Sequence, residues 1–265
     1  MEQLSAGASR QGELWGYAYR DWVEFQEPTM HGLWLAVLDA AGAGDGTRLL
    51  DAGCGAGGAV VVAAQRGSVV SGVDPSVNMI TVARERLPSA DLRIAELENL
   101  PFPNASFDAA CAINSLQFTT NPQLAVHELG RVCRAGGRVV IAVHGDPARS
   151  DMSAVTEAIF ALFEKRPSGG PFALSSPEVL RSMVDSVSGL SLDAISETAN
   201  DTDYPLLDAA VRGMMSAGGS RRAAEILGDD RVREATREAL TRFAGADGRV
   251  RLRNTYWIAR AVKHQ

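Results

Sequence analysis

Residues 49–58 read Leu49-Leu50-Asp51-Ala52-Gly53-Cys54-Gly55-Ala56-Gly57-Gly58. The apolar run that ends at Asp51 predicts a buried β-strand. The glycines after it allow the backbone to turn sharply and to run close to a ligand before a helix begins near Ala59. This pattern is typical of a nucleotide-type binding turn. A tight strand-to-helix turn that binds nothing would use the same glycines, so the neighbouring segments have to decide between the two.

Asp51 distinguishes between the ligands that such a turn could bind. Gly53, Gly55 and Gly58 also satisfy the spacing of the dinucleotide-binding fingerprint, so the glycines alone do not separate NAD from another adenosine ligand. A carboxylate directly ahead of the loop would oppose a pyrophosphate, whereas it would attract a ligand that carries an ammonium group. Asp51 therefore favours a positively charged adenosine ligand.

The chain around this turn alternates between strand and helix patterns. The predicted strands are 48–51, 69–73, 92–95, 107–113 and 138–143, and the predicted helices are 59–66, 76–87 and 122–133. Ser76 and Asn121 are expected to cap two of these helices, and Pro122 takes the first helical position of the third. Such alternation predicts a parallel sheet with helices on both faces and a ligand at the carboxyl ends of the strands.

Further helices are expected before and after this core. Aromatic and apolar residues at helical spacing predict helices at 12–26 and 29–41. Later patterns predict helices at 152–164 and 177–187, a strand at 190–197, helices within 201–248 and a last strand at 250–262. Within 201–248, Gly218-Gly219 is interpreted as a loop and Asp229 to Arg237 as a solvated helix face.

Composition narrows the classes of partner. The chain has 265 residues, of which 46% are hydrophobic, as is ordinary for a globular protein. Its formal net charge of -6 does not indicate the basic surface that is typical of nucleic-acid binding. No apolar run is long enough to span a membrane, and residues 1–20 lack a signal-peptide pattern, so we expect a cytoplasmic protein. Three scattered cysteines and four dispersed histidines predict a reduced protein without a metal site.

Asp74 ends the second predicted strand, about twenty residues after the glycine turn. A carboxylate at this position accepts hydrogen bonds from both ribose hydroxyls, so it supports an adenosine ligand without specifying which one. A turn residue ahead of Pro75 is the alternative interpretation.

Three segments together resemble the class I S-adenosylmethionine (SAM) dependent methyltransferases, and the overall pattern is similar to bacterial enzymes that act on small molecules. Asp51-x-Gly53-x-Gly55-x-Gly57 resembles the first motif of that family. Residues 95–108, AELENLPFPNASFD, resemble its run GDAExLPFxDxSFD, with Glu96 where Asp is usual. Residues 129–141 resemble its run RVLxPGG followed by apolar residues, with Ala135 in place of the proline. Gly136 and Gly137 are expected to end the helix there.

The resemblance implies a fold class and a cofactor. We expect an α/β fold with a Rossmann-like, seven-stranded, mostly parallel sheet, an antiparallel last strand, N-terminal helices and a helical lid insertion. The expected division is an N-terminal helical cap at 1–44, a SAM-binding core at 45–200, the lid at 201–248 and the last core strand at 249–265. The implied cofactor-binding residues are Asp51, Gly53, Gly55, Gly57, Asp74, Pro75, Met79, Glu96, Leu97 and Asn114.

The expected function is methylation of an O, N or C atom of a small-molecule acceptor, with S-adenosylhomocysteine as the product. Because the sulfonium already activates the methyl group, the protein mainly has to hold the acceptor in line and exclude water. The candidate substrate contacts are Trp22, Gln117 and Phe118, and His144, with His31 as the weaker alternative, is the candidate base. The sequence is compatible with a homodimer and does not require one.

Three other functions keep many of the same residues. A SAM-binding enzyme of this fold that catalyses a reaction without methyl transfer, such as a cyclisation, would keep every cofactor residue named above. An NAD-dependent oxidoreductase would keep the glycines and Asp74, but it is disfavoured by Asp51, by the N-terminal helices and by the 100–108 run. A non-catalytic SAM-binding module is the least favoured, because a lid implies an enclosed pocket.

Overall fold

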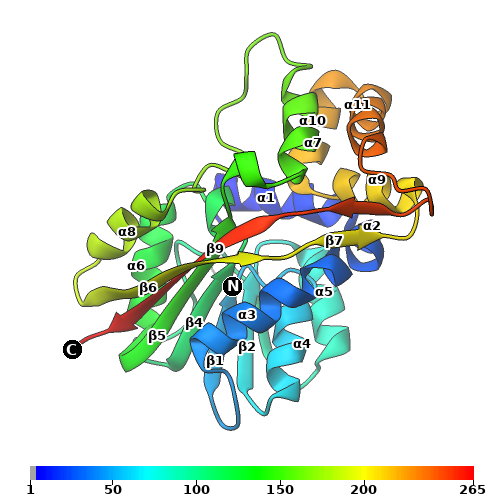
Figure 1. Cartoon of the computed structure of the whole chain (residues 1–265). Helices are drawn as coiled ribbons and strands as arrows, with labels where there is room; N and C mark the ends of the chain where they lie inside the picture. The colour runs from blue at the N-terminus through cyan, green and yellow to red at the C-terminus, as the bar shows by residue number, and fades with distance from the viewer. Residues whose placement is uncertain (1–3) are drawn as a thin grey trace.

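The computed structural model describes residues 4–265, which form a central sheet flanked by helices (Figure 1). The sheet has seven strands in the order β3-β2-β1-β4-β5-β9-β6. Strands β1 to β5 pair in parallel, and β9 runs antiparallel to both of its neighbours. The strands are β1 (Arg48–Ala52), β2 (Val69–Asp74), β3 (Asp91–Ile94), β4 (Phe107–Ile113), β5 (Cys133–His144), β6 (Leu190–Ala199) and β9 (Thr255–Lys263). The predicted fold class is confirmed.

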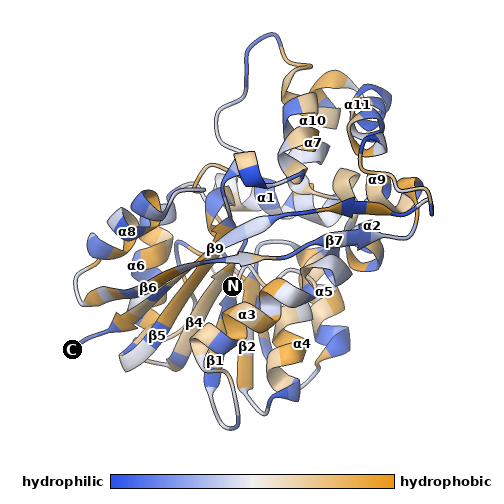
Figure 2. Ribbon diagram, in the orientation of Figure 1, coloured by the Kyte–Doolittle hydropathy of each residue, from blue (hydrophilic) through white to orange (hydrophobic). Residues whose placement is uncertain are grey.

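Two apolar cores separate the sheet from the helices on its two faces. One face packs against α3 (His31–Ala41), α4 (Gly58–Gln65) and α5 (Val77–Arg86). The other face packs against α6 (Pro122–Val132) and α8 (Pro177–Asp185). The central strands are covered on both faces, and Figure 2 accordingly shows them as largely hydrophobic. This burial explains why these strands are predominantly apolar in the sequence.

The local capping chemistry agrees with the prediction from sequence. The Ser76 side chain accepts a hydrogen bond from the Met79 N–H at the start of α5. The Asn121 side chain accepts from Leu124 N–H, with Pro122 at the first position of α6. These caps satisfy backbone donors that have no partner within the helix, and they fix the two helices to the carboxyl edge of the sheet.

The N-terminal region differs from the single helix predicted at 12–26. It consists of α1 (Ala6–Tyr17), the short α2 (Tyr19–Asp21), a π-helical turn (Trp22–Gln26) and a 3-10 turn (Glu27–Met30). Ala18 interrupts the helix because its backbone, at φ -113° and ψ 38°, is not helical. The apolar periodicity detected the buried face but could not detect this interruption.

The remaining helices gather beyond the carboxyl ends of the parallel strands (Figure 1). They have an apolar core of their own, which includes Val155, Val211 and Leu240. They are α7 (Met152–Phe160), α9 (Leu207–Met215), α10 (Gly218–Leu227) and α11 (Asp229–Thr241), joined by the two-stranded sheet of β7 (Thr202–Tyr204) and β8 (Val250–Leu252). The division of the chain into domains stays a prediction.

Three local predictions in this half of the chain are wrong. Gly218-Gly219 is not a loop but starts α10, where Gly218 lies against the Trp15 indole. The last strand is divided, because buried Asn254 separates β8 from β9. The helix predicted at 152–164 ends at Phe160.

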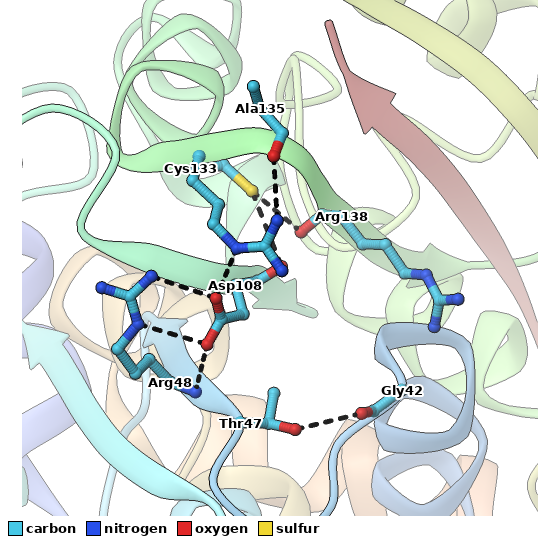
Figure 3. Close-up of polar contacts among 8 residues, drawn as sticks. Gly42, Thr47, Arg48, Asp108, Cys133, Ala135 and Arg138 are labelled. Carbon is cyan, nitrogen blue, oxygen red and sulfur yellow. Dashed lines mark hydrogen bonds and ion pairs between the residues drawn. The ribbon is translucent and has the colours of Figure 1, made fainter.

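The amino edge of the sheet is held by Asp108 (Figure 3). Its carboxylate accepts hydrogen bonds from Arg48 N, Nε and Nη2, and from Arg134 Nε at 2.5 Å. These bonds keep the pKa of Asp108 well below its usual range, with the Arg48 side chain as the largest cause. The pairing links the start of β1 to β4 and β5.

The prediction that Gly136 and Gly137 end a helix is wrong. Strand β5 begins at Cys133, so both glycines lie within the strand.

No helix among residues 4–265 has the length and apolarity that crossing a bilayer would require.

Candidate functional site

A pocket opens at the carboxyl edge of the parallel strands, directly over the glycine turn. It holds about 1020 Å³ of empty space, its open mouth included. Its walls come from β1, β2 and β4, from the loops after them, and from the N-terminal region. The predicted residues among its lining are Trp22, Asp51, Gly53, Gly55, Asp74, Pro75, Met79, Glu96, Leu97, Asn114 and Phe118.

The glycine turn requires its glycines for two separate reasons. Gly53, Gly55 and Gly57 all have positive φ, between 53° and 85°, where other residues are strained. Gly53 also has no room for a side chain, because a Cβ there would lie 2.3 Å from Ser115 Cβ. The turn is tied to the sheet by Gly53 N and Cys54 N, which both donate to Val73 O. Gly57 shapes the turn without lining the pocket.

Two buried carboxyl groups lie side by side at the strand ends. Asp74 is 9% exposed and accepts hydrogen bonds from Gly55 N at 3.0 Å and Ser76 N at 2.8 Å. Asp51 is 2% exposed, and its Oδ1 has no hydrogen-bond partner. Burial raises the pKa of Asp51 to about 7, with a smaller contribution from the Asp74 carboxylate. Burial likewise raises the pKa of Asp74 to about 6. Among residues 4–265, no Arg, Lys or His lines the pocket beside this pair.

The far end of the pocket has a polar and an apolar side. Glu96 lines it, and its Oε2 accepts hydrogen bonds from both the backbone N–H and the hydroxyl of Ser5. Buried Met79 and Leu97 supply apolar surface beside it. A flat ring with an exocyclic donor matches this combination of apolar walls and an acceptor.

The end of β4 contributes a strained residue. Asn114 has a φ of 54°, in the left-handed region that residues other than glycine rarely adopt. Its side-chain oxygen accepts from Gln117 Nε2 at 2.6 Å, and its backbone N–H donates to Ala142 O. Gln117 itself is not part of the pocket lining, and its Oε1 is buried without a hydrogen-bond partner. Strain of this kind is frequent at binding sites.

An aromatic wall closes the pocket on the side of the N-terminal region. Trp15 packs edge-to-face against Trp22, with ring centroids 5.1 Å apart, and against Phe118 at 5.0 Å. Trp34 completes the wall next to α4, where it lies against Gly58. The predicted substrate contacts Trp22 and Phe118 therefore both pack against Trp15. The sequence alone did not identify Trp15 as a pocket residue.

The two histidines predicted as bases lie elsewhere. His144 is 3% exposed and lies between the rings of Phe172 and Tyr256, outside the pocket lining. Burial lowers the pKa of His144 to about 3, so it is a weak base. His31 is exposed and stacks edge-to-face near Trp34, also outside the lining. A catalytic role for either stays a prediction, and these positions argue against it.

Glu27 is a pocket residue that sequence reasoning missed. Its Oε1 accepts from Gly58 N–H at 3.2 Å, and its Oε2 accepts from Arg86 Nη1 at 2.6 Å. Burial is the largest cause that raises its pKa, partly offset by Arg86. Glu27 stands in an N-terminal segment with no motif, 31 residues before Gly58 and 59 before Arg86. No local signal in the sequence identifies it.

Comparisons with known proteins agree with this geometry. Residues 50–141 match the family model described as a methyltransferase domain. The chain is similar to a phosphatidylethanolamine N-methyltransferase of Cereibacter sphaeroides, at 34% identity over 45% of this chain and 61% of the relative. It is also similar to a demethylmenaquinone methyltransferase of Renibacterium salmoninarum, at 35% identity over 42% of this chain and 47% of the relative. The chain thus matches less than two thirds of the length of either relative.

Solved structures share the fold. The YcgJ protein from Bacillus subtilis superimposes with a TM-score of 0.61 at 20% identity, over 89% of this chain and 99% of that one. The [4+2]-cyclase SpnF superimposes with a TM-score of 0.53 at 22% identity, over 88% of this chain and 80% of that one. Identities this low establish the common fold and not a common reaction. The sheet order, the glycine turn and the domain matched at residues 50–141 all support a class I SAM-dependent methyltransferase.

Proposed function

We propose that this protein transfers the methyl group of SAM to a small-molecule acceptor and releases S-adenosylhomocysteine. The observation that carries the proposal is the charge of the pocket wall. Among residues 4–265, five carboxyl groups line the pocket and no Arg, Lys or His does. They are Glu27, Asp51, Asp74, Glu96 and Glu98. Such a wall favours a ligand with positive charge and opposes one with phosphates.

The residues present fit SAM at each end of the pocket. Asp51, with its unpartnered buried oxygen, suits the ammonium group of the methionine half. Asp74 suits the ribose hydroxyls, and Glu96, with Met79 and Leu97 beside it, suits the adenine ring. The dinucleotide NAD would bring a pyrophosphate to the same acidic wall, so the charges disfavour an oxidoreductase.

The chain's own contribution to the reaction is positioning. Bound SAM supplies a methyl group that its sulfonium charge already activates. Asn114, Trp22 and Phe118 line the pocket where the N-terminal region meets the end of β4, and they would orient the acceptor and exclude water. Gln117 would act through Asn114, whose side chain it holds. A metal ion or a covalent enzyme intermediate is not required by this chemistry.

Calorimetric titration with SAM, S-adenosylhomocysteine and NAD tests the cofactor. We expect micromolar binding of the first two and none of NAD. Asp51→Ala and Asp74→Ala should each weaken SAM binding by about tenfold or more, since each loses a charge-assisted contact. Asp185→Ala, at an exposed position at the end of α8, is the matched control and should bind normally. Binding of NAD alone would overturn the proposal.

A SAM-binding enzyme that does not transfer the methyl group would have the same cofactor pocket. Product analysis separates the two, because S-adenosylhomocysteine accumulates only if a methyl group leaves. The cytoplasmic location and the possible homodimer stay predictions from the sequence, and the methylated atom stays open among O, N and C.

A further inference from the structure

The N-terminus of α4 is the place where a fold of this kind can bind an anion. The first helix after β1 points its free backbone N–H groups and the positive end of its dipole toward the glycine turn. In dinucleotide-binding proteins a pyrophosphate occupies this position. Here the N–H of Gly58, the first residue of α4, donates instead to the Glu27 carboxylate.

Glu27 is held firmly at this position. Its second oxygen pairs with Arg86 of α5, whose Nη1 also donates to Ala56 O within the glycine turn. The side chain is only 7% exposed, and the residue lines the pocket. The helix terminus and the guanidinium would together bind a ligand phosphate, and both are already bound to a carboxylate of the chain itself.

We infer that Glu27 determines the cofactor specificity of the pocket, by filling the anion position at the start of α4 and so excluding adenosine ligands that carry phosphate. The inference rests on the proposed function and adds a residue to it. Glu27 lies outside the αβ core, in the 3-10 turn at Glu27–Met30. Through Glu27, the N-terminal region would therefore change the ligand preference of the pocket, from a ligand with phosphate groups to a cationic one.

The test compares the binding of SAM with the binding of ADP, a probe that has the same adenosine and adds a diphosphate. Glu27→Ala frees the Gly58 N–H and Arg86, so we expect ADP affinity to rise by about tenfold or more relative to wild type. SAM affinity should change less than ADP affinity, because the freed donors favour its carboxylate whereas the lost negative charge disfavours its ammonium and sulfonium groups. Inorganic phosphate should compete with ADP in this variant and have no such effect on SAM.

Two further variants keep the result interpretable. Glu27→Gln retains the volume and an acceptor for the Gly58 N–H but removes the charge, so the rise in ADP affinity should be smaller than in Glu27→Ala. Glu13→Ala removes an exposed carboxylate from α1 and should leave the ratio of ADP to SAM affinity unchanged. A purely structural role of Glu27 would weaken both ligands together and leave this ratio constant.

The outcomes separate this inference from the proposed function. If wild type binds SAM and the affinity ratio is the same in wild type and both Glu27 variants, the inference is wrong and the proposed function stands. If wild type fails to bind SAM but Glu27→Ala gains ADP binding, the proposed function is wrong and Glu27 still blocks the anion position.

Discussion

Asp51 and Asp74 lie at the carboxyl ends of the neighbouring strands β1 and β2, and both line the pocket. Their elevated pKa values have the same main cause, which is burial without a cation. For a carboxyl group whose pKa is higher in the folded than in the unfolded state, stability is lost as the pH rises between the two values. These two groups therefore contribute a loss of stability to the free protein from about pH 4 to pH 7, and a cationic ligand offsets that loss by favouring the ionised forms.

This coupling predicts a pH dependence of cofactor binding. The proposed SAM site needs Asp51 in its ionised form. At a pH below its pKa of about 7, Asp51 is mostly protonated in the free protein, so SAM binding requires the release of a proton. We expect SAM to bind about five- to tenfold more weakly at about pH 6 than at about pH 7.5, a range in which the α-amino group of SAM stays largely protonated. Calorimetry across this range measures the effect.

The Asp51→Asn variant is the control for that pH dependence. It removes the titrating group while it preserves the side-chain volume, so its weaker SAM binding should be nearly independent of pH. A wild-type affinity that is constant over the same range would show that Asp51 is already ionised in the free protein.

Helix α1 covers the pocket by approaching the loop after β2 very closely. A Cβ at Gly12 would lie 2.4 Å from Pro75 O, and one at Gly16 would lie 2.5 Å from Ser76 Oγ. Ala8, Gln11 and Trp15 of the same helix line the pocket. The small residues thus set the distance between the helix and the cofactor position.

Gly12→Ala should therefore weaken cofactor binding through the position of α1. Alanine favours the helix by about 1 kcal/mol, but overpacking against backbone costs about 1–3 kcal/mol. We expect a net loss of stability and SAM binding weakened by about tenfold, measured by thermal unfolding and titration. Gly219→Ala in α10, where nothing lies within 4 Å of the added methyl, should bind SAM as wild type does. Equal binding by both variants would argue that α1 does not shape the site.

The two edges of the sheet have different roles, since the carboxyl edge forms the pocket and the amino edge stabilises the fold. The carboxyl edge holds strained or unpartnered groups, such as Asn114 and Asp51. The amino edge holds Asp108, whose carboxylate is fully engaged with Arg48 and Arg134 (Figure 3). Because its pKa is depressed, this group stabilises the fold above about pH 4, and that contribution is lost as the pH falls further.

Asp108→Asn should consequently affect stability alone. Loss of charge-assisted hydrogen bonds to two arginines should lower the free energy of unfolding by about 1–3 kcal/mol at neutral pH. The SAM dissociation constant should change less than twofold, because the pocket lies at the opposite edge. Urea unfolding and titration give the two quantities, and Asp185→Asn serves as the control. A marked loss of SAM affinity at unchanged stability would contradict this separation.

The sequence alone determined the core of this fold and its most diagnostic residues. Strand β4 (Phe107–Ile113) is apolar from Ala109 to Ile113, and caps such as Ser76 and Asn121 act within three residues. The glycine turn follows β1 directly, and Asp51 and Asp74 lie at the carboxyl ends of β1 and β2, so the parallel sheet carries them to one edge. These positions depend on local backbone preferences and on burial, and both can be predicted from the order of apolar, glycine and capping residues in the sequence.

Only the tertiary structure decided what surrounds those residues. Ser5 reaches Glu96 across 91 positions, Glu27 reaches Gly58 across 31, and Trp15 meets Phe118 and α10. The same packing placed His144 between two aromatic rings and outside the pocket. The physical reason is that such contacts join segments far apart in the chain, and their formation depends on how the N-terminal region packs over the sheet rather than on any local pattern.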